Sequence, residues 1–130
     1  DQVRIVTGIP HERVPEYLNA MDLMCAPSET APNWREVFGR MIVEAFACGV
    51  AVVASDSGEM PRVVADAGRI VHERSPIELS DAIRDLLDRP ALRSEYAARG
   101  LERVRTTYTW PIVARRHLDF FEELLSGRAR

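Results

Sequence analysis

The sequence has no apolar run that approaches the ~18 residues of a membrane span, and it begins without the basic, apolar and small-residue pattern of a signal peptide. It also lacks an excess of one charge, because its 17 basic and 20 acidic residues are interspersed and give a net charge of -3. Such a chain has no bulk field that would attract nucleic acid or anionic lipid. We therefore expect a cytoplasmic protein with no nucleic-acid partner.

Cysteine and histidine are scarce, and neither is spaced for metal binding. Cys25 and Cys48 stand in apolar surroundings without a CxxC motif, so we predict two buried free thiols in a reducing compartment. His11, His72 and His117 are scattered along the chain, which favours surface or packing roles. We expect no metal site and no cofactor.

The 130 residues suffice for one domain, and the first part of the chain alternates apolar strands with helices. Continuous apolar strands are typical of parallel sheets that are covered on both faces. We predict an α/β fold with a Rossmann-like parallel sheet and flanking helices over residues 1–72. The expected strands are "VRIV", "DLMCAP", "VAVVAS" and "GRIV".

From residue 75 to residue 126 the pattern changes to helices alone. The first has Ser75 as a predicted cap and Pro76 at its first position, and the last has Thr109 as a predicted cap. Between them lies a more polar helix that we expect to break near Gly100. We predict that the basic residues of these helices form a solvated surface; they are Arg103, Arg105, Arg115 and Arg116.

Two glutamates, Glu36 and Glu44, lie eight positions apart around a mostly apolar helix that opens at Gly39. In an open parallel sheet, ligands bind where the carboxyl ends of strands meet helix N-termini. The amides from about Phe38 to Met41 would point outward at the positive end of the helix dipole, which favours phosphate. A buried carboxylate at Glu44 needs donors, and the vicinal hydroxyls of a ligand would supply them.

A purely structural interpretation of the two glutamates stays open. Glu36 can cap the helix start electrostatically. Glu44 can pair with Arg40, which lies one turn earlier in the same helix. Neither role needs a ligand.

The string "APSETAPNWREVFGRMIVEAFACGVAVVASDSGEMPRVV", followed by "DAGRIV", resembles the C-terminal half of family-four retaining glycosyltransferases with the GT-B fold. That family has "PS", then E-x-F-G, then a second glutamate that completes E-x7-E, then "EA-A-G-PVV-S-GG-PE". The matching residues are Pro27, Ser28, Glu36, Phe38, Gly39, Glu44, Ala45, Gly49, Val52, Val53, Ser55, Gly58 and Pro61. The chain would then be an incomplete GT-B C-terminal domain.

The resemblance implies a donor site for a nucleotide-diphosphate sugar. It places Glu36 at the donor sugar as the catalytic residue and Glu44 at the ribose, with the diphosphate on backbone amides near Gly39 and Arg40. The remaining residues of the predicted donor site are Ser28, Val37 and Phe38. No Asp-x-Asp motif occurs in the sequence, which agrees with a metal-independent mechanism in which the helix and basic residues neutralise the leaving diphosphate.

The resemblance also implies that the parent protein is a hexosyltransferase-type enzyme of polysaccharide biosynthesis with a glycan or lipid-linked acceptor. Such enzymes have two Rossmann-like domains, and the acceptor domain is absent from this chain. We therefore expect a missing N-terminal domain, or another chain, to cover the sheet edge, and the isolated chain to be inactive. The parent would be cytoplasmic, either free or associated with the inner face of the membrane.

Two other functions stay open at this point. One is a non-catalytic nucleotide-binding or assembly module that pairs its exposed sheet edge with another chain. The other is an epimerase or phosphorylase of the same fold, which would need further catalytic acids or a phosphate site.

Overall fold

The computed structural model describes residues 2–127, so the ends of the predicted domain, residues 1 and 128–130, lie outside the described part. Three strands form one parallel sheet in the order β1 (Leu23–Ala26), β2 (Ala51–Ser55) and β3 (Arg69–Val71). The helical elements are η1 (His11–Arg13), α1 (Val14–Asn19), α2 (Arg40–Ala47), α3 (Met60–Val64), α4 (Pro76–Asp88), α5 (Pro90–Arg103), the π-helical turn η2 (Val104–Tyr108) and α6 (Trp110–Leu125).

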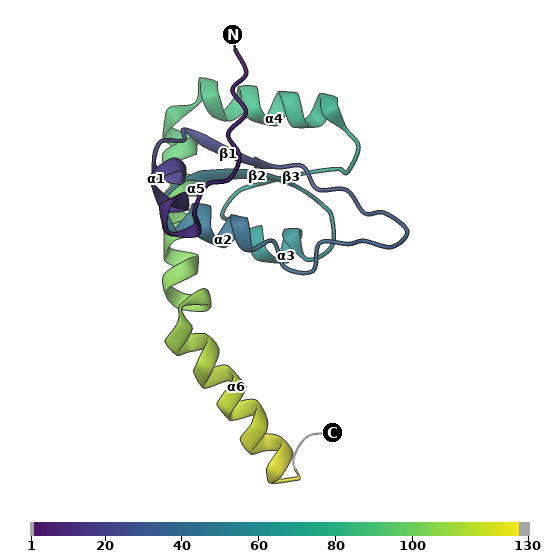
Figure 1. Cartoon of the computed structure of the whole chain (residues 1–130), viewed down its shortest axis with the longest axis vertical. Coiled ribbons are helices and arrows are strands. Elements are labelled where there is room, and N and C mark those ends of the chain that lie inside the picture. The colour runs from purple at the N-terminus through teal and green to yellow at the C-terminus, as the bar shows by residue number, and fades with distance from the viewer. Residues whose placement is uncertain (1, 128–130) are drawn as a thin grey trace.

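Strand β2 is the centre of the structure, and all five of its residues are buried. Its side chains alternate between two apolar clusters, because successive residues of a strand face opposite sides of the sheet. Val52 and Ala54 pack with residues of α1, α2 and α3, whereas Val53 packs with residues of α4. Figure 1 shows α4 on one side of the sheet and α2 and α3 on the other. The predicted α/β fold with a parallel sheet is confirmed.

Helix α2 begins where the sequence predicts, because Gly39 occupies the N-cap position with a left-handed φ of 79°. Its buried side chains are Ile42, Ala45 and Phe46. Met41, in the first turn of the helix, is 39% exposed and lies outside this buried set. The helix is rotated so that Phe46 reaches the core.

The predicted strand at residues 3–6 is absent among the described residues, and Val3 and Ile5 are 78% and 85% exposed. A strand exists only where it pairs with a neighbour, and β1 pairs with β2 alone. Strand β1 therefore lies at an edge of the sheet. Cys25 on this strand is exposed, so its predicted burial is wrong, and Cys48 is half-buried.

The helical part agrees with the sequence in its positions but not in its capping. Ser75 and Thr109 stand at the N-cap positions of α4 and α6, yet neither side chain makes a capping hydrogen bond. Pro76 is within the first turn of α4, as predicted. Helix α6 runs away from the sheet (Figure 1). It buries no residue, although its sequence includes large apolar residues. Within residues 2–127, none of the helices combines the length and apolar character needed to cross a membrane.

Helix α5 continues through Gly100, where the sequence analysis expected a break. Gly100 is buried, and a Cβ at this position would lie 2.3 Å from Cδ1 of Phe46. The absence of a side chain lets α5 approach α2 closely.

We expect Gly100→Ala to destabilise the chain. Overpacking against Phe46 costs roughly 1–3 kcal/mol, which exceeds the ~1 kcal/mol that alanine gains over glycine in a helix. Thermal unfolding followed by circular dichroism measures the difference. Ala98→Gly, at an exposed position of the same helix, gives the propensity term alone. A higher unfolding temperature for Gly100→Ala would contradict the packing argument.

Candidate functional site

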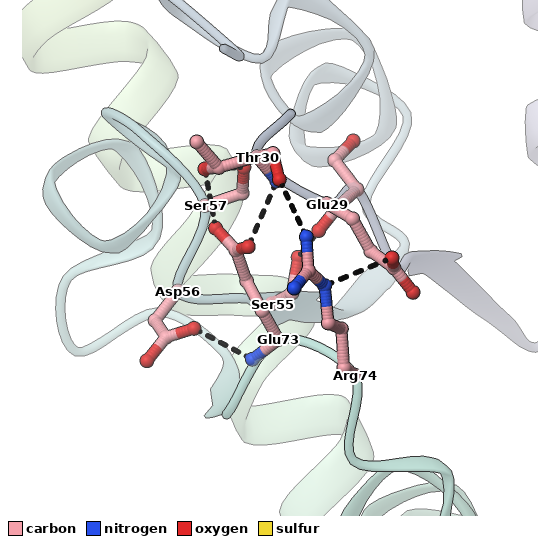
Figure 2. A network of polar contacts seen from close by, with 8 residues as sticks. Glu29, Thr30, Ser55, Asp56, Ser57, Glu73 and Arg74 are labelled. Atoms are coloured by element: carbon pink, nitrogen blue, oxygen red, sulfur yellow. Dashed lines mark hydrogen bonds and ion pairs between the residues drawn. The ribbon is translucent and has the colours of Figure 1, made fainter. Parts of the chain in front are cut away.

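The carboxyl ends of the three parallel strands meet at one edge of the sheet, and the loops that follow them are fastened together by polar contacts. Figure 2 shows this network, in which Thr30 follows β1, Ser57 follows β2 and Glu73 follows β3. Ligands of open parallel sheets bind at this edge. The network therefore lies where the sequence predicts a site.

Glu73 is the hub of the network. The amide of Thr30 donates to its Oε2 at 2.8 Å, and the hydroxyl of Thr30 donates to its Oε1 at 2.6 Å. The same hydroxyl lies 3.1 Å from Oγ of Ser57. The hydrogen bonds from Thr30 favour the ionised carboxylate, so they lower the pKa of Glu73 below its usual value. Glu73 thus holds the long loop after β1 against the loop after β3.

Arg74 adds a second fastening between the same two loops. Its Nη2 donates to the carbonyl of Thr30 at 2.9 Å, and its Nε lies 3.3 Å from Oε2 of Glu29. Arg74 has a left-handed φ of 59°, which is uncommon for a residue with a side chain. On the other side, the amide of Glu73 donates to Oδ1 of Asp56 at 2.7 Å, which ties β3 to the end of β2.

Glu36 lies at the far end of this loop, directly before α2. Its Oε1 accepts hydrogen bonds from the amides of Gly39 at 2.9 Å and Phe38 at 3.3 Å. The amides from Phe38 to Met41 were expected to point outward. Those of Phe38 and Gly39 are instead bonded to Glu36 and are not free to contact a ligand. The amides of Arg40 and Met41 make no hydrogen bond to any other residue in the described part of the chain.

The backbone of Glu36 is held by the turn after β2. The amide of Glu59 donates to the carbonyl of Glu36 at 3.2 Å. Gly58 has a φ of 56°, and a Cβ there would lie only 1.8 Å from the Glu36 carbonyl oxygen. Only a glycine allows this approach. The position of Glu36 is thus fixed relative to the central strand.

Glu44 lies more than one turn into α2 and pairs with Arg40, whose Nε is 3.2 Å from Oε1. The Glu44 side chain is 30% exposed. It borders a small pocket of about 160 Å³ together with His11, Val14 and Cys48. An exposed pair of this kind contributes only ~0.3–0.5 kcal/mol. A ligand can therefore displace the pair at little cost.

The predicted donor residues lie at the two ends of the loop between β1 and α2, most of them at its second end. Val37, Phe38, Gly39 and Arg40 are contiguous with Glu36 at the start of α2. Ser28 lies at the other end of the loop, where its carbonyl accepts a hydrogen bond from the Ser55 hydroxyl at 2.5 Å. Glu36 bonds the amides at the helix start and Glu44 pairs with Arg40, as the purely structural interpretation of the two glutamates expects. Their roles toward a donor stay predictions.

Sequence reasoning missed the residues that fasten the loops. Thr30, Asp56, Glu73 and Arg74 are polar residues placed shortly after the strand ends. That placement was the available signal, but the side chains' partners lie 17 to 45 residues away in the chain. The prediction that Arg103 is solvated surface is also wrong, because this half-buried side chain donates to backbone carbonyls of α3.

The fold and the site together define a class of protein. A parallel sheet, a glycine-capped helix at its carboxyl edge and two glutamates eight residues apart are the features of a GT-B C-terminal domain. Residues 1–103 match the family described as "Glycosyl transferases group 1". The chain belongs to this family.

Relatives and solved structures agree with this assignment. The chain is 33% identical over 117 residues to the GDP-mannose-dependent monoacylated alpha-(1-6)-phosphatidylinositol monomannoside mannosyltransferase of Corynebacterium glutamicum, with 88% of this chain and 31% of the relative covered. Sucrose-phosphate synthase from Thermosynechococcus elongatus superimposes with a TM-score of 0.81 at 29% identity, covering 94% of this chain and 30% of that one.

A further solved structure is the C-terminal domain of a glycosyl transferase group 1 family protein from Francisella tularensis. It has a TM-score of 0.71 at 27% identity and covers 82% of this chain and 53% of that chain. The chain spans about 30% of the length of the curated relatives it matches, for example 31% and 29%. It corresponds to the C-terminal region of such glycosyltransferases.

We expect Gly58→Ala to displace Glu36 and to destabilise the chain. The left-handed φ costs a residue with a side chain roughly 1–2 kcal/mol, and the contact with the Glu36 carbonyl adds a clash. Gly49→Ala is the matched control, because Gly49 has a φ of 68° but a Cβ there has nothing within 4 Å. Urea unfolding should show the larger loss for Gly58→Ala. Equal losses would show that the contact with Glu36 does not matter.

We expect the attachment of Thr30 to depend on pH. Because the pKa of Glu73 is lowered in the folded chain, the attachment is complete above the ordinary glutamate value of 4.5 and is lost as pH falls through the lower, folded pKa. The amide chemical shift of Thr30, followed by NMR, should titrate below pH 4.5 in the unsubstituted chain and not in Glu73→Gln. A titration that persists in Glu73→Gln would assign it to another group.

Proposed function

We propose that the parent protein is a retaining glycosyltransferase that transfers a hexose from a nucleotide-diphosphate sugar to a glycan or lipid-linked acceptor. The observation that carries this proposal is the start of α2, where Glu36, Glu44 and two amides without partners among residues 2–127 lie along one short segment. The Corynebacterium relative is a GDP-mannose-dependent mannosyltransferase named for a phosphatidylinositol monomannoside, which supports both parts of the proposal.

Each residue has a defined role in this proposal. The amides of Arg40 and Met41, at the positive end of α2, hold the diphosphate, and the Arg40 guanidinium is released from Glu44 to assist them. Glu44 then accepts hydrogen bonds from the ribose hydroxyls. Ser28, Val37 and Phe38 border the donor, and Glu36 orients the sugar.

The proposed reaction breaks the bond between the anomeric carbon and the diphosphate and forms a bond from that carbon to the acceptor oxygen on the same face of the sugar. The leaving diphosphate takes the acceptor's proton. The helix start and basic residues stabilise the charge that develops on the leaving group, without a metal ion or cofactor.

Turnover needs more than this chain. The acceptor must be positioned opposite the donor, and positioning accounts for a large part of a rate enhancement. We propose that an N-terminal domain completes the acceptor site, and that the isolated chain binds donor without transferring sugar. For the parent protein we propose a cytoplasmic location, either free or at the inner face of the membrane.

An NMR titration of the chain with UDP-, GDP- and ADP-sugars tests the donor site. We expect one nucleotide to bind and Glu44→Gln to weaken it roughly tenfold, because each ribose hydrogen bond to a charged group contributes ~1.5–3 kcal/mol. Glu95→Gln is the matched control, since Glu95 forms an equally local pair with Arg99 in α5 at 2.5 Å. Equal affinities for Glu44→Gln and Glu95→Gln would contradict the role of Glu44.

A further inference from the structure

A second pocket lies beside the candidate donor site and shares two residues with it. It has a volume of about 390 Å³ and lies between the segment before α2, helix α3, the turn η2 and helix α6. Val37 and Phe38 border it, and Phe38 is packed edge-on against Tyr108 with ring centroids 5.7 Å apart. Neither Arg40 nor Glu44 borders it. The pocket is therefore adjacent to the donor site but distinct from the diphosphate and ribose positions.

The pocket carries an excess of positive charge in a chain whose net charge is -3. Three arginines, Arg62, Arg103 and Arg116, line the pocket, and Glu59 is the one carboxylate residue among the described residues that line it. The Arg62 side chain is 86% exposed and reaches Glu59 only at 3.7 Å. Arg116 forms no ion pair with any residue between 2 and 127. Ion pairs within the described part of the chain therefore leave most of this positive charge unneutralised.

Arg103 is held in place without being neutralised. Its Nε donates to the carbonyl of Val63 at 2.8 Å and its Nη2 to the carbonyl of Arg62 at 2.7 Å. The guanidinium also lies over the ring of Tyr108, 5.7 Å from its centroid. These partners are uncharged, so the positive charge stays available to an anion. Because the Arg103 side chain is already ordered, binding a ligand would cost it little further conformational entropy.

We propose that this pocket binds a phosphate group of the acceptor; the acceptor role rests on the proposed function. The planar guanidinium group of arginine can donate two parallel hydrogen bonds to the oxygens of a phosphate. Three such groups around one cavity carry more positive charge than a single carboxylate neutralises. A phosphate held here fixes the acceptor next to Val37 and Phe38, one and two residues after Glu36. The acceptor hydroxyl is thereby directed toward the donor sugar.

The test is an NMR titration of the chain with glucose 6-phosphate, with glucose as the uncharged control. We expect glucose 6-phosphate to shift the signals of Val37, Phe38 and the Arg103 side chain. The double variant Arg62→Gln, Arg116→Gln should weaken binding roughly tenfold or more, because it removes two charge-assisted contacts. Both side chains end in solvent-facing groups, so folding should be retained. Arg84→Gln, on the exposed face of α4, should bind as tightly as the parent sequence.

A second arm distinguishes a soluble sugar phosphate from a lipid headgroup. The same variants are tested for co-sedimentation with phosphatidylinositol vesicles and with phosphatidylcholine vesicles. Dependence on Arg62 and Arg116 in either arm supports the pocket, and the arm with tighter binding names the source of the phosphate. Independence from both arginines in both arms overturns the proposal, as do shifts confined to the amides of Arg40 and Met41. Nucleotide binding at Arg40 and Glu44 is read separately, so failure of the donor site is distinguishable from failure of this pocket.

Discussion

The close approach of Gly58 to the carbonyl of Glu36 is the constraint on which the candidate site depends. A Cβ added at Gly58 would lie 1.8 Å from that oxygen, so no other residue fits at this position without moving the loop. The contact joins the turn after the fully buried strand β2 to the segment that opens α2. The rigid centre of the sheet therefore sets the position of Glu36, although Glu36 itself lies in a loop.

The long loop after β1 is fixed at both ends by different means. Near its start, Glu73 and Arg74 hold the backbone of Thr30 by charge-assisted hydrogen bonds. Near its end, Glu36 holds the amides of Phe38 and Gly39, and its own carbonyl is held by Glu59. Between these anchors Trp34 and Val37 are 50% and 79% exposed. The loop thus presents exposed side chains at the strand-end edge while its ends are fixed, which suits a surface that receives a ligand.

The sequence predicted what depends on local pattern and failed where distant partners decide. Apolar runs located β1, β2 and β3, and Gly39 located the start of α2, because these signals lie within a few residues. Residues 3–6 were predicted from a similar apolar pattern, but no strand of the described part of the chain pairs with them. Gly100 was interpreted as a helix breaker because its contact with Phe46, a residue of another helix, leaves no local signal in the sequence. Likewise, no spacing rule connects Thr30 with Glu73, 43 residues away. The two glutamates were found from their spacing and family resemblance, but their contacts were not fixed by spacing alone.

The most direct test of the donor-site account is a crystal structure of this chain with the nucleoside diphosphate that binds it. We expect a phosphate against the amides of Arg40 and Met41 and ribose hydroxyls on Glu44. We also expect Oε1 of Glu44 to move away from Nε of Arg40, which now lies 3.2 Å from it. A nucleotide bound elsewhere, with the pair of Arg40 and Glu44 intact, would contradict it and leave both glutamates with structural roles only.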